Sequence, residues 1–77
     1  LEGTAKQVVW AEQIRAKFLE LSEQIKKQLE TKADDPKVLQ LFAVLDDAKS
    51  NSKASFWIDN RYDFDSVRGI IIWTGIK

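Results

Sequence analysis

The residues with the greatest capacity for chemistry lie in one segment near the C-terminal end of the sequence. Asp59, Asp63 and Asp65 fall close together, and hard cations such as Ca²⁺ or Mg²⁺ prefer clustered carboxylates. The spacing does not match a calcium-binding loop. A loop beginning at Asp59 would place Arg61 at a ligand position and Ile70 where the bidentate glutamate belongs. We therefore interpret the aspartates as helix caps and ion-pair partners, and predict no metal site.

The same segment interleaves cations with aromatic rings. In sites for single-stranded nucleic acid, rings stack on bases while cations contact phosphates. Four residues are candidates for such contacts: Lys53, Arg61, Tyr62 and Arg68. The nearby aspartates would repel a phosphate backbone, and a small domain needs large rings for its core. We expect Trp57 and Trp73 to be buried and Tyr62 to be exposed, which makes nucleic-acid binding the second choice.

Composition restricts enzymatic chemistry further. The 77 residues include neither cysteine nor histidine, which excludes a thiolate nucleophile, a zinc–thiolate site and the commonest general base. A chain of this length buries only about 60% of the surface that its unfolded form exposes, so an enclosed substrate cleft is not expected. We therefore predict a non-catalytic protein that requires no cofactor.

Charge and hydropathy are those of an ordinary globular domain. The 12 basic and 12 acidic side chains balance, whereas nucleic-acid-binding modules usually carry a basic excess. The longest apolar run, Ile70 to Trp73, is far shorter than the roughly 20 residues that cross a bilayer. The sequence begins at Leu1 without an initiator methionine. We predict one domain over residues 1–77, a fragment of a longer cytoplasmic protein with no membrane segment.

The first structural element required by the pattern is a long helix. Thr4 precedes Gln7 by three positions, which is the spacing of a capping box at a helix start. Large apolar residues then recur every three or four positions and define one face: Trp10, Ile14, Phe18, Leu21, Ile25 and Leu29. The pattern predicts a helix from residue 5 to about residue 32.

A second helix is predicted directly after a tight turn. Asp35 and Pro36 suit a helix start, and the inward stripe over residues 36–49 consists of Val38, Leu41, Phe42, Leu45 and Ala48. The short connection implies an antiparallel hairpin with the first helix. Leu39 and Val44 lie off this stripe, so we predict that they contact another element or a protein partner.

The C-terminal third permits two interpretations. In the first, Ser52 caps a third helix of about two turns, and Asp63 or Asp65 caps a fourth. In the second, residues 55–58 pair with residues 70–74 as strands, because the run of isoleucines also suits a strand. The first interpretation predicts an all-α helical bundle with a long N-terminal helical hairpin and one or two short C-terminal helices. The alternative is an α+β fold.

Two blocks of sequence resemble a pattern found in uncharacterised bacterial and phage-like proteins, in which G-(S/T)-x-K-Q-x-x-W-A-E-x-I-R precedes W-I-D-x-R. The first block here is Gly3-Thr4, Lys6-Gln7, Trp10-Ala11-Glu12 and Ile14-Arg15, and the second is Phe56-Trp57-Ile58-Asp59-Asn60-Arg61. The resemblance implies a bacterial or mobile-element source. It implies no activity and no catalytic residue.

The joint appearance of these blocks suggests a structural contact between them. Arg15 lies near the apolar face of the first helix, where an arginine needs a carboxylate partner. We predict that Arg15 pairs with Asp59, and that Trp10 and Trp57 support the same junction. The resulting functional prediction is a non-catalytic protein-interaction or assembly module of a larger bacterial protein, whose partner is another protein or another domain of the same chain. An accessory nucleic-acid-binding domain is the alternative.

Overall fold

The computed structural model describes residues 1–76, and within them every named element of secondary structure is a helix or a 3-10 turn. The elements are, in order, α1 (Ala5–Leu29), the 3-10 turn η1 (Glu30–Lys32), α2 (Pro36–Lys49), α3 (Ala54–Asp59), the 3-10 turn η2 (Asp63–Asp65) and α4 (Val67–Thr74). The all-α prediction is therefore confirmed. The α+β alternative is wrong, because residues 70–74 belong to α4.

Helix α1 forms the long axis of the molecule. Its capping box is present: the Gln7 backbone N–H donates to Thr4 Oγ1 over 3.2 Å, and the Thr4 backbone N–H donates to Gln7 Oε1 over 3.0 Å. At 1.5 Å per residue its 25 residues extend about 37 Å, and the molecule measures 41 × 18 × 18 Å. The predicted helix end near residue 32 corresponds to the end of η1.

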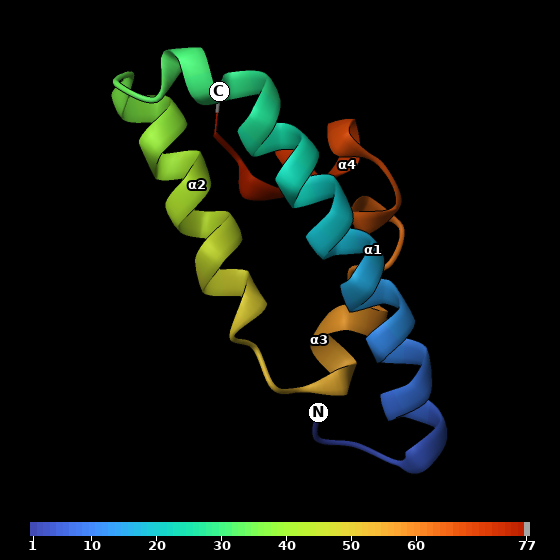
Figure 1. Cartoon of the computed structure of the whole chain (residues 1–77). Coiled ribbons are helices and arrows are strands. Elements are labelled where there is room, and N and C mark those ends of the chain that lie inside the picture. The colour runs from blue at the N-terminus through green and yellow to red at the C-terminus, as the bar shows by residue number, and fades with distance from the viewer. Residues whose placement is uncertain (77) are drawn as a thin grey trace.

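Helix α2 returns antiparallel to α1 (Figure 1), as the short turn predicts. Asp35 caps it by accepting a hydrogen bond from the Lys37 N–H over 2.9 Å, and Pro36 occupies its first turn. The bounds agree with the prediction because this start signal is local. The buried residues of α2 are Val38, Leu41, Leu45 and Ala48, whereas Phe42 is half-buried.

Helix α3 lies between the lower ends of α1 and α2 in Figure 1, beside the N-terminus. Ser52 does not cap it, contrary to the prediction. Lys53 occupies the N-cap position and provides no side-chain cap. Instead, the extended N-terminal segment pairs with the helix start: the Ala54 N–H donates to the Glu2 carbonyl over 2.8 Å, and the Glu2 N–H donates to the Ser52 carbonyl over 2.6 Å. A distant backbone carbonyl thus replaces the expected local cap.

Helix α4 is capped by Ser66 and not by Asp63 or Asp65. The two aspartates lie in η2, which turns Phe64 into the core and leaves Ser66 at the N-cap position, where its hydroxyl accepts a hydrogen bond from the Gly69 N–H over 3.0 Å. Gly69 is required by this close packing, because a Cβ there would lie 2.4 Å from the Asp63 carbonyl oxygen.

The core is centred on an aromatic cluster contributed by α1, α3, η2 and α4. Phe18 of α1 lies 4.7 Å from Phe64 and 5.2 Å from Trp57, measured between ring centroids. Trp73 of α4 approaches Phe64 at 5.0 Å. Trp57 is completely buried and Trp73 is half-buried. The expectation that these tryptophans fill the core is confirmed for Trp57 and holds in part for Trp73.

No helix within residues 1–76 combines the length and the apolar composition that a bilayer span requires. Helix α1 is long enough at 25 residues, but charged side chains recur along it. Helix α4 is strongly apolar but has only 8 residues.

Candidate functional site

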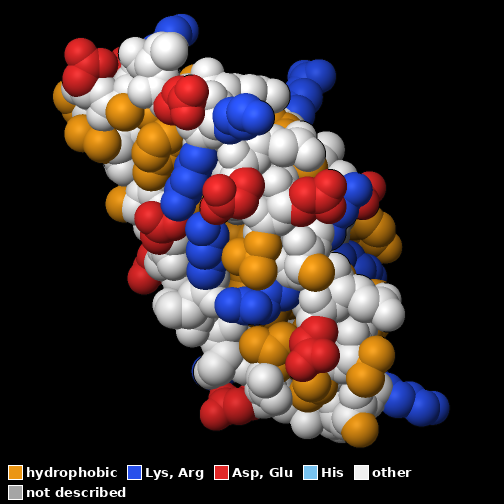
Figure 2. All heavy atoms as spheres, in the orientation of Figure 1, with side chains coloured by type: hydrophobic (Ala, Val, Ile, Leu, Met, Phe, Trp, Pro, Cys, Tyr) orange, Lys and Arg blue, Asp and Glu red, His pale blue; other side chains and the backbone are white. Residues whose placement is uncertain are grey.

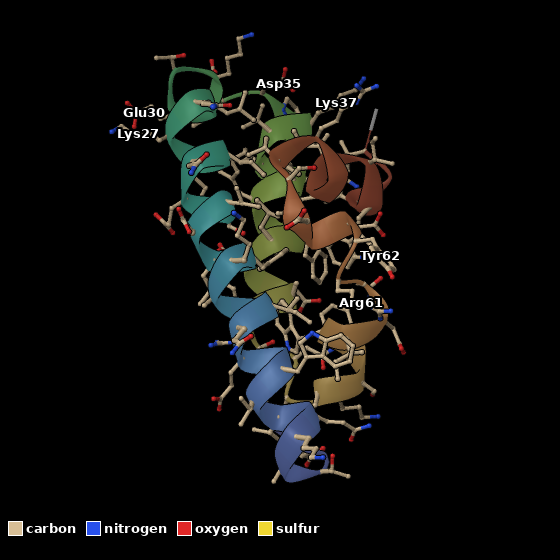
Figure 3. The ribbon with its side chains drawn as sticks, turned by 90° about the vertical axis from the view of Figure 1, so that its right-hand side faces the viewer. Lys27, Glu30, Asp35, Lys37, Arg61 and Tyr62 are labelled. Carbon is tan, nitrogen blue, oxygen red and sulfur yellow. The ribbon has the colours of Figure 1, made fainter. Side chains whose placement is uncertain are left out.

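The arginine side chain of Arg61 lies against two aromatic rings at the surface. Its Cζ atom is 5.1 Å from the centroid of the Trp10 ring and 4.6 Å from the centroid of the Tyr62 ring. Its Nη1 donates to the Ile58 carbonyl over 2.7 Å, and its Nη2 donates to the Tyr62 hydroxyl over 3.3 Å. Arg61 and Tyr62 lie together in Figure 3, beside α1. We call Trp10, Arg61 and Tyr62 the Arg61 cluster.

The elements around the cluster explain its position. Helix α3 ends at Asp59, and the turn that follows carries Arg61 and Tyr62 back beside α1. Hydrogen bonds from the Asn60 and Arg61 backbone N–H groups to Phe56 and Ile58 tighten this turn. The Ile58 carbonyl of the same turn accepts a hydrogen bond from the Arg61 guanidinium and so holds it against the Trp10 ring.

Trp10 is more exposed than the sequence pattern predicts. The predicted apolar face of α1 is buried at Phe18, Leu21 and Ile25, whereas Trp10 is 46% exposed. At this level of α1 the buried residue is Ala11, and the six-residue α3 is too short to cover both flanks of the longer helix. Trp10 is therefore partly exposed at the surface and partly packed against its neighbours.

Two shallow depressions meet at Trp10. One, of about 270 Å³, lies between α1 and η2 and is lined by Trp10, Gln13, Ile14, Lys17, Arg61, Phe64 and Asp65. The other lies along the outside of α1 and is lined by Ala5, Lys6, Val9, Trp10 and Gln13. Val9 is 58% exposed. We call residues Ala5, Lys6, Val9, Trp10, Gln13 and Lys17 the α1 strip.

The charges around Trp10 are unevenly distributed. Within the α1 strip the charged side chains are Lys6 and Lys17, and the Arg61 guanidinium borders it. Asp65 is the carboxylate that lines the depression beside Lys17. An apolar surface with cations at its edges can bind by burying its rings and aliphatic side chains while its cations pair with carboxylates or phosphates.

The structure joins only two of the four candidate nucleic-acid-binding residues. Arg61 and Tyr62 are in contact, and Tyr62 is 79% exposed, as predicted for the exposed ring. Lys53 is exposed at the start of α3, and Arg68 is exposed in the first turn of α4. Within residues 1–76 no side-chain hydrogen bond or ion pair links Lys53 or Arg68 to the Arg61 cluster.

The two candidate protein-interaction residues of α2 differ in exposure. Leu39 is 52% exposed, whereas Val44 is half-buried. Leu39 belongs to a row of exposed residues along α2 that also contains Ala43, Asp47 and, at the edge next to α1, Asp46. We call these four residues the α2 outer stripe. In Figure 2 hydrophobic and acidic side chains gather along the left edge of the molecule, over α2.

The predicted ion pair between Arg15 and Asp59 does not form. Arg15 Nη2 donates to the Lys49 carbonyl over 3.1 Å, and Asp59 is exposed. The carbonyls of the last helical turn have no partner within the helix, and the helix dipole favours a cation there. Arg15 therefore joins α1 to the end of α2, and not to α3.

The ion pairs of the described chain lie elsewhere, two between α1 and α2 and one within α2. Lys26 and Lys49 both bind Asp46, and Glu23 lies 3.7 Å from Lys49. The hydrogen bond from Lys26 lowers the pKa of Asp46 below its ordinary value, and the same bond raises the pKa of Lys26. Asp59, Asp63 and Asp65 are exposed, and no three acidic side chains within residues 1–76 come close enough to hold a metal ion.

The contact between Trp10 and Arg61 is the feature that sequence reasoning missed. Both residues stand in the two blocks that resemble the bacterial and phage-like pattern, and α1 and α3 do pack against each other. The joint appearance of the blocks thus indicates correctly that they pack together, but the residues in contact are Trp10 and Arg61 and not Arg15 and Asp59.

Comparisons with protein-family models, with curated proteins and with solved structures yield no match to this chain.

Proposed function

We propose that this chain is a non-catalytic protein-interaction or assembly module, and that it binds its partner through the α1 strip and the Arg61 cluster. The observation that carries the proposal is the exposure of Trp10 and Val9, at 46% and 58%, where the Trp10 ring also lies against the fixed guanidinium of Arg61. Large apolar side chains at this exposure cost free energy in water, and covering them with a partner recovers it.

The residue types support a protein partner. Tryptophan, tyrosine and arginine are the residues that most often dominate binding energy at protein interfaces. Here one of each forms a single cluster, and the Ile58 carbonyl and two rings already hold the guanidinium. A side chain that is ordered before binding loses less conformational entropy when the partner arrives.

Nucleic-acid binding remains the second candidate because Tyr62 is 79% exposed beside a cation. Two features favour protein over nucleic acid. The guanidinium of Arg61 already lies against the Trp10 and Tyr62 rings, which restricts the ring surface left for base stacking. Val9 and Ala5 add aliphatic surface, for which a phosphodiester backbone has no complement.

Site-specific photo-crosslinking tests the proposal in the cells that normally produce the protein. A photoreactive amino acid replaces Val9 in the α1 strip, and the matched control places it at Gln28, which is exposed on the same helix outside the strip. We expect a crosslinked protein at position 9 that is absent at position 28. The additional substitution Arg61→Ala is expected to reduce its yield.

Two outcomes would contradict the proposal. Crosslinks to nucleic acid alone, with binding in vitro that weakens steeply between about 50 and 200 mM salt, would establish the second candidate. Equal crosslinking at positions 9 and 28 would show that the α1 strip has no specific partner.

A further inference from the structure

Two exposed helix faces of this molecule have complementary composition. The α1 strip combines Val9 and Trp10 with the cations Lys6 and Lys17. The α2 outer stripe combines the apolar Leu39 and Ala43 with two aspartates. An apolar centre with opposite charges at matching edges is the arrangement that two bound surfaces adopt.

The two faces cannot meet within one molecule. Helix α2 lies at the left of Figure 1, whereas the Arg61 cluster is seen when the right-hand side of that view faces the reader (Figure 3), with α2 behind. Each copy therefore offers both surfaces on opposite sides. We propose that the α1 strip of one copy binds the α2 outer stripe of a second copy, so that the assembly module of the proposed function, on which this inference rests, assembles with itself head to tail.

The dimensions of the two faces agree. At 1.5 Å per residue the α1 strip extends about 18 Å along its helix, and the α2 outer stripe extends about 12 Å. Leu39, which is 52% exposed, can therefore lie against Val9 and Trp10 while Asp47 reaches a strip lysine. The pairing covers apolar side chains on both molecules.

The available charges favour this orientation. Asp46 already binds Lys26 and Lys49, whereas within residues 1–76 Asp47 has no ion-pair partner. Lys6 and Lys17 likewise form no ion pair in the described chain. The whole chain has a formal net charge of zero, so copies approach one another without long-range repulsion.

The contact is heterologous, since the strip and the stripe are different surfaces. Such contacts leave one unpaired strip and one unpaired stripe at the ends of every open assembly, and growth continues unless the rotation closes a ring. The expected species are therefore a concentration-dependent series and not a single closed dimer.

Sedimentation velocity over a concentration series tests the proposal with charge-reversal variants. We expect the unmodified chain to self-associate. Lys17→Glu and Asp47→Lys are each expected to raise the association midpoint about tenfold or more, because each places like charges in contact. The matched controls Lys27→Glu and Asp34→Lys change exposed residues outside both faces and are expected to leave the midpoint unchanged.

Mixing and charge exchange make the test specific for the head-to-tail contact. In an equimolar mixture of the Lys17→Glu and Asp47→Lys proteins, the unmodified strip of one protein meets the unmodified stripe of the other, and the two substituted faces also carry opposite charges, so we expect the mixture to recover the self-association that each protein alone has lost. The double variant Lys17→Glu with Asp47→Lys restores opposite charges and is expected to recover self-association. Circular dichroism of each variant verifies the helical fold.

A monomer at every concentration overturns the inference, as does self-association that neither charge reversal weakens. The proposed function fails separately. If position 9 crosslinks a different protein and the chain is monomeric, the interaction module stands and the second copy is excluded; if position 9 crosslinks nothing specific, the module itself is excluded.

Discussion

Arg61 shows how a single side chain can serve packing and binding together. Its guanidinium donates to a backbone carbonyl of its own turn, donates to the Tyr62 hydroxyl and lies against the Trp10 ring. These contacts join the turn after α3 to α1 without burying either ring completely. A lysine could not reproduce them, because the contacts use several donors of one planar group.

Replacing Arg61 with alanine is expected to destabilise the protein by about 1–2 kcal/mol. The change removes two contacts between cation and ring, each worth about 0.5–1 kcal/mol at an exposed site, together with the bond to the Ile58 carbonyl. Urea unfolding measures the difference. Arg68→Ala is the matched control, since Arg68 is exposed on α4, and it should change stability by less than about 0.5 kcal/mol. Equal losses in both variants would refute the role of Arg61.

At the scale of elements, local signals determined where helices begin only when no distant segment competed. The capping box at Thr4 and the start at Asp35 and Pro36 formed as the sequence predicts. The starts of α3 and α4 did not. At α3, the Glu2 carbonyl accepts the hydrogen bond from the first N–H group of the helix, which the sequence predicts Ser52 to cap. At α4, the turn η2 buries Phe64 and leaves Ser66 at the N-cap position.

Two serine substitutions distinguish these caps. Ser66→Ala is expected to lower the free energy of unfolding by about 1 kcal/mol, because the Gly69 N–H loses its acceptor. Ser52→Ala should be nearly neutral, since the pairing with Glu2 uses the Ser52 backbone carbonyl, which the substitution retains. Thermal or urea unfolding of the two variants provides the comparison. A larger loss from Ser52→Ala than from Ser66→Ala would show that the predicted cap operates after all.

At the scale of the whole molecule, the two long helices are held together by few polar links. Lys26 of α1 binds Asp46 of α2, Lys49 of α2 pairs with Glu23 of α1, and Arg15 donates to the end of α2. The aromatic cluster lies among α1, α3, η2 and α4, and the buried Leu41, Leu45 and Ala48 of α2 belong to the same core. The stability of the α1–α2 hairpin therefore comes mainly from burial of its apolar stripe, and the ion pairs add a modest contribution that depends on pH.

The pH dependence of the ion-pair contribution follows from the directions in which the pKa values of Asp46 and Lys26 shift on folding. The pKa of Asp46 is lowered from 3.8, so its contribution is present above that value and is lost as the pH falls through the folded-state pKa. The pKa of Lys26 is raised from 10.5, so its contribution is present below that value and is lost as the pH rises through the folded-state pKa. Near neutral pH both contributions are complete.

Asp46→Asn is therefore expected to cost at most about 1 kcal/mol at pH 7, because the Asp46 side chain is 56% exposed and water screens the pair. The difference from the unmodified chain should shrink at about pH 2, where both proteins lack the carboxylate charge. Urea unfolding at the two pH values measures it, with Asp34→Asn as the control in an exposed turn. A difference that is independent of pH would exclude the charge of Asp46 as its source.

The sequence by itself determined the helical class, the bounds of α2, the start of α1 and the burial of Trp57, because capping residues and apolar periodicity act within one or two turns. It also identified Tyr62 as an exposed ring and Leu39 as lying off the inward stripe. These properties depend on neighbours along the chain.

Only the tertiary structure decided what lies beside Trp10 and Arg15. Both residues stand at the edge of the apolar face of α1, where a small difference in the coverage by α3 separates a core position from a surface one. Arg61 reached Trp10, and Arg15 reached the Lys49 carbonyl, across gaps of 34 residues or more in the sequence. Periodicity specifies which side of a helix is buried, but the partner of an edge residue depends on how far the neighbouring helices extend.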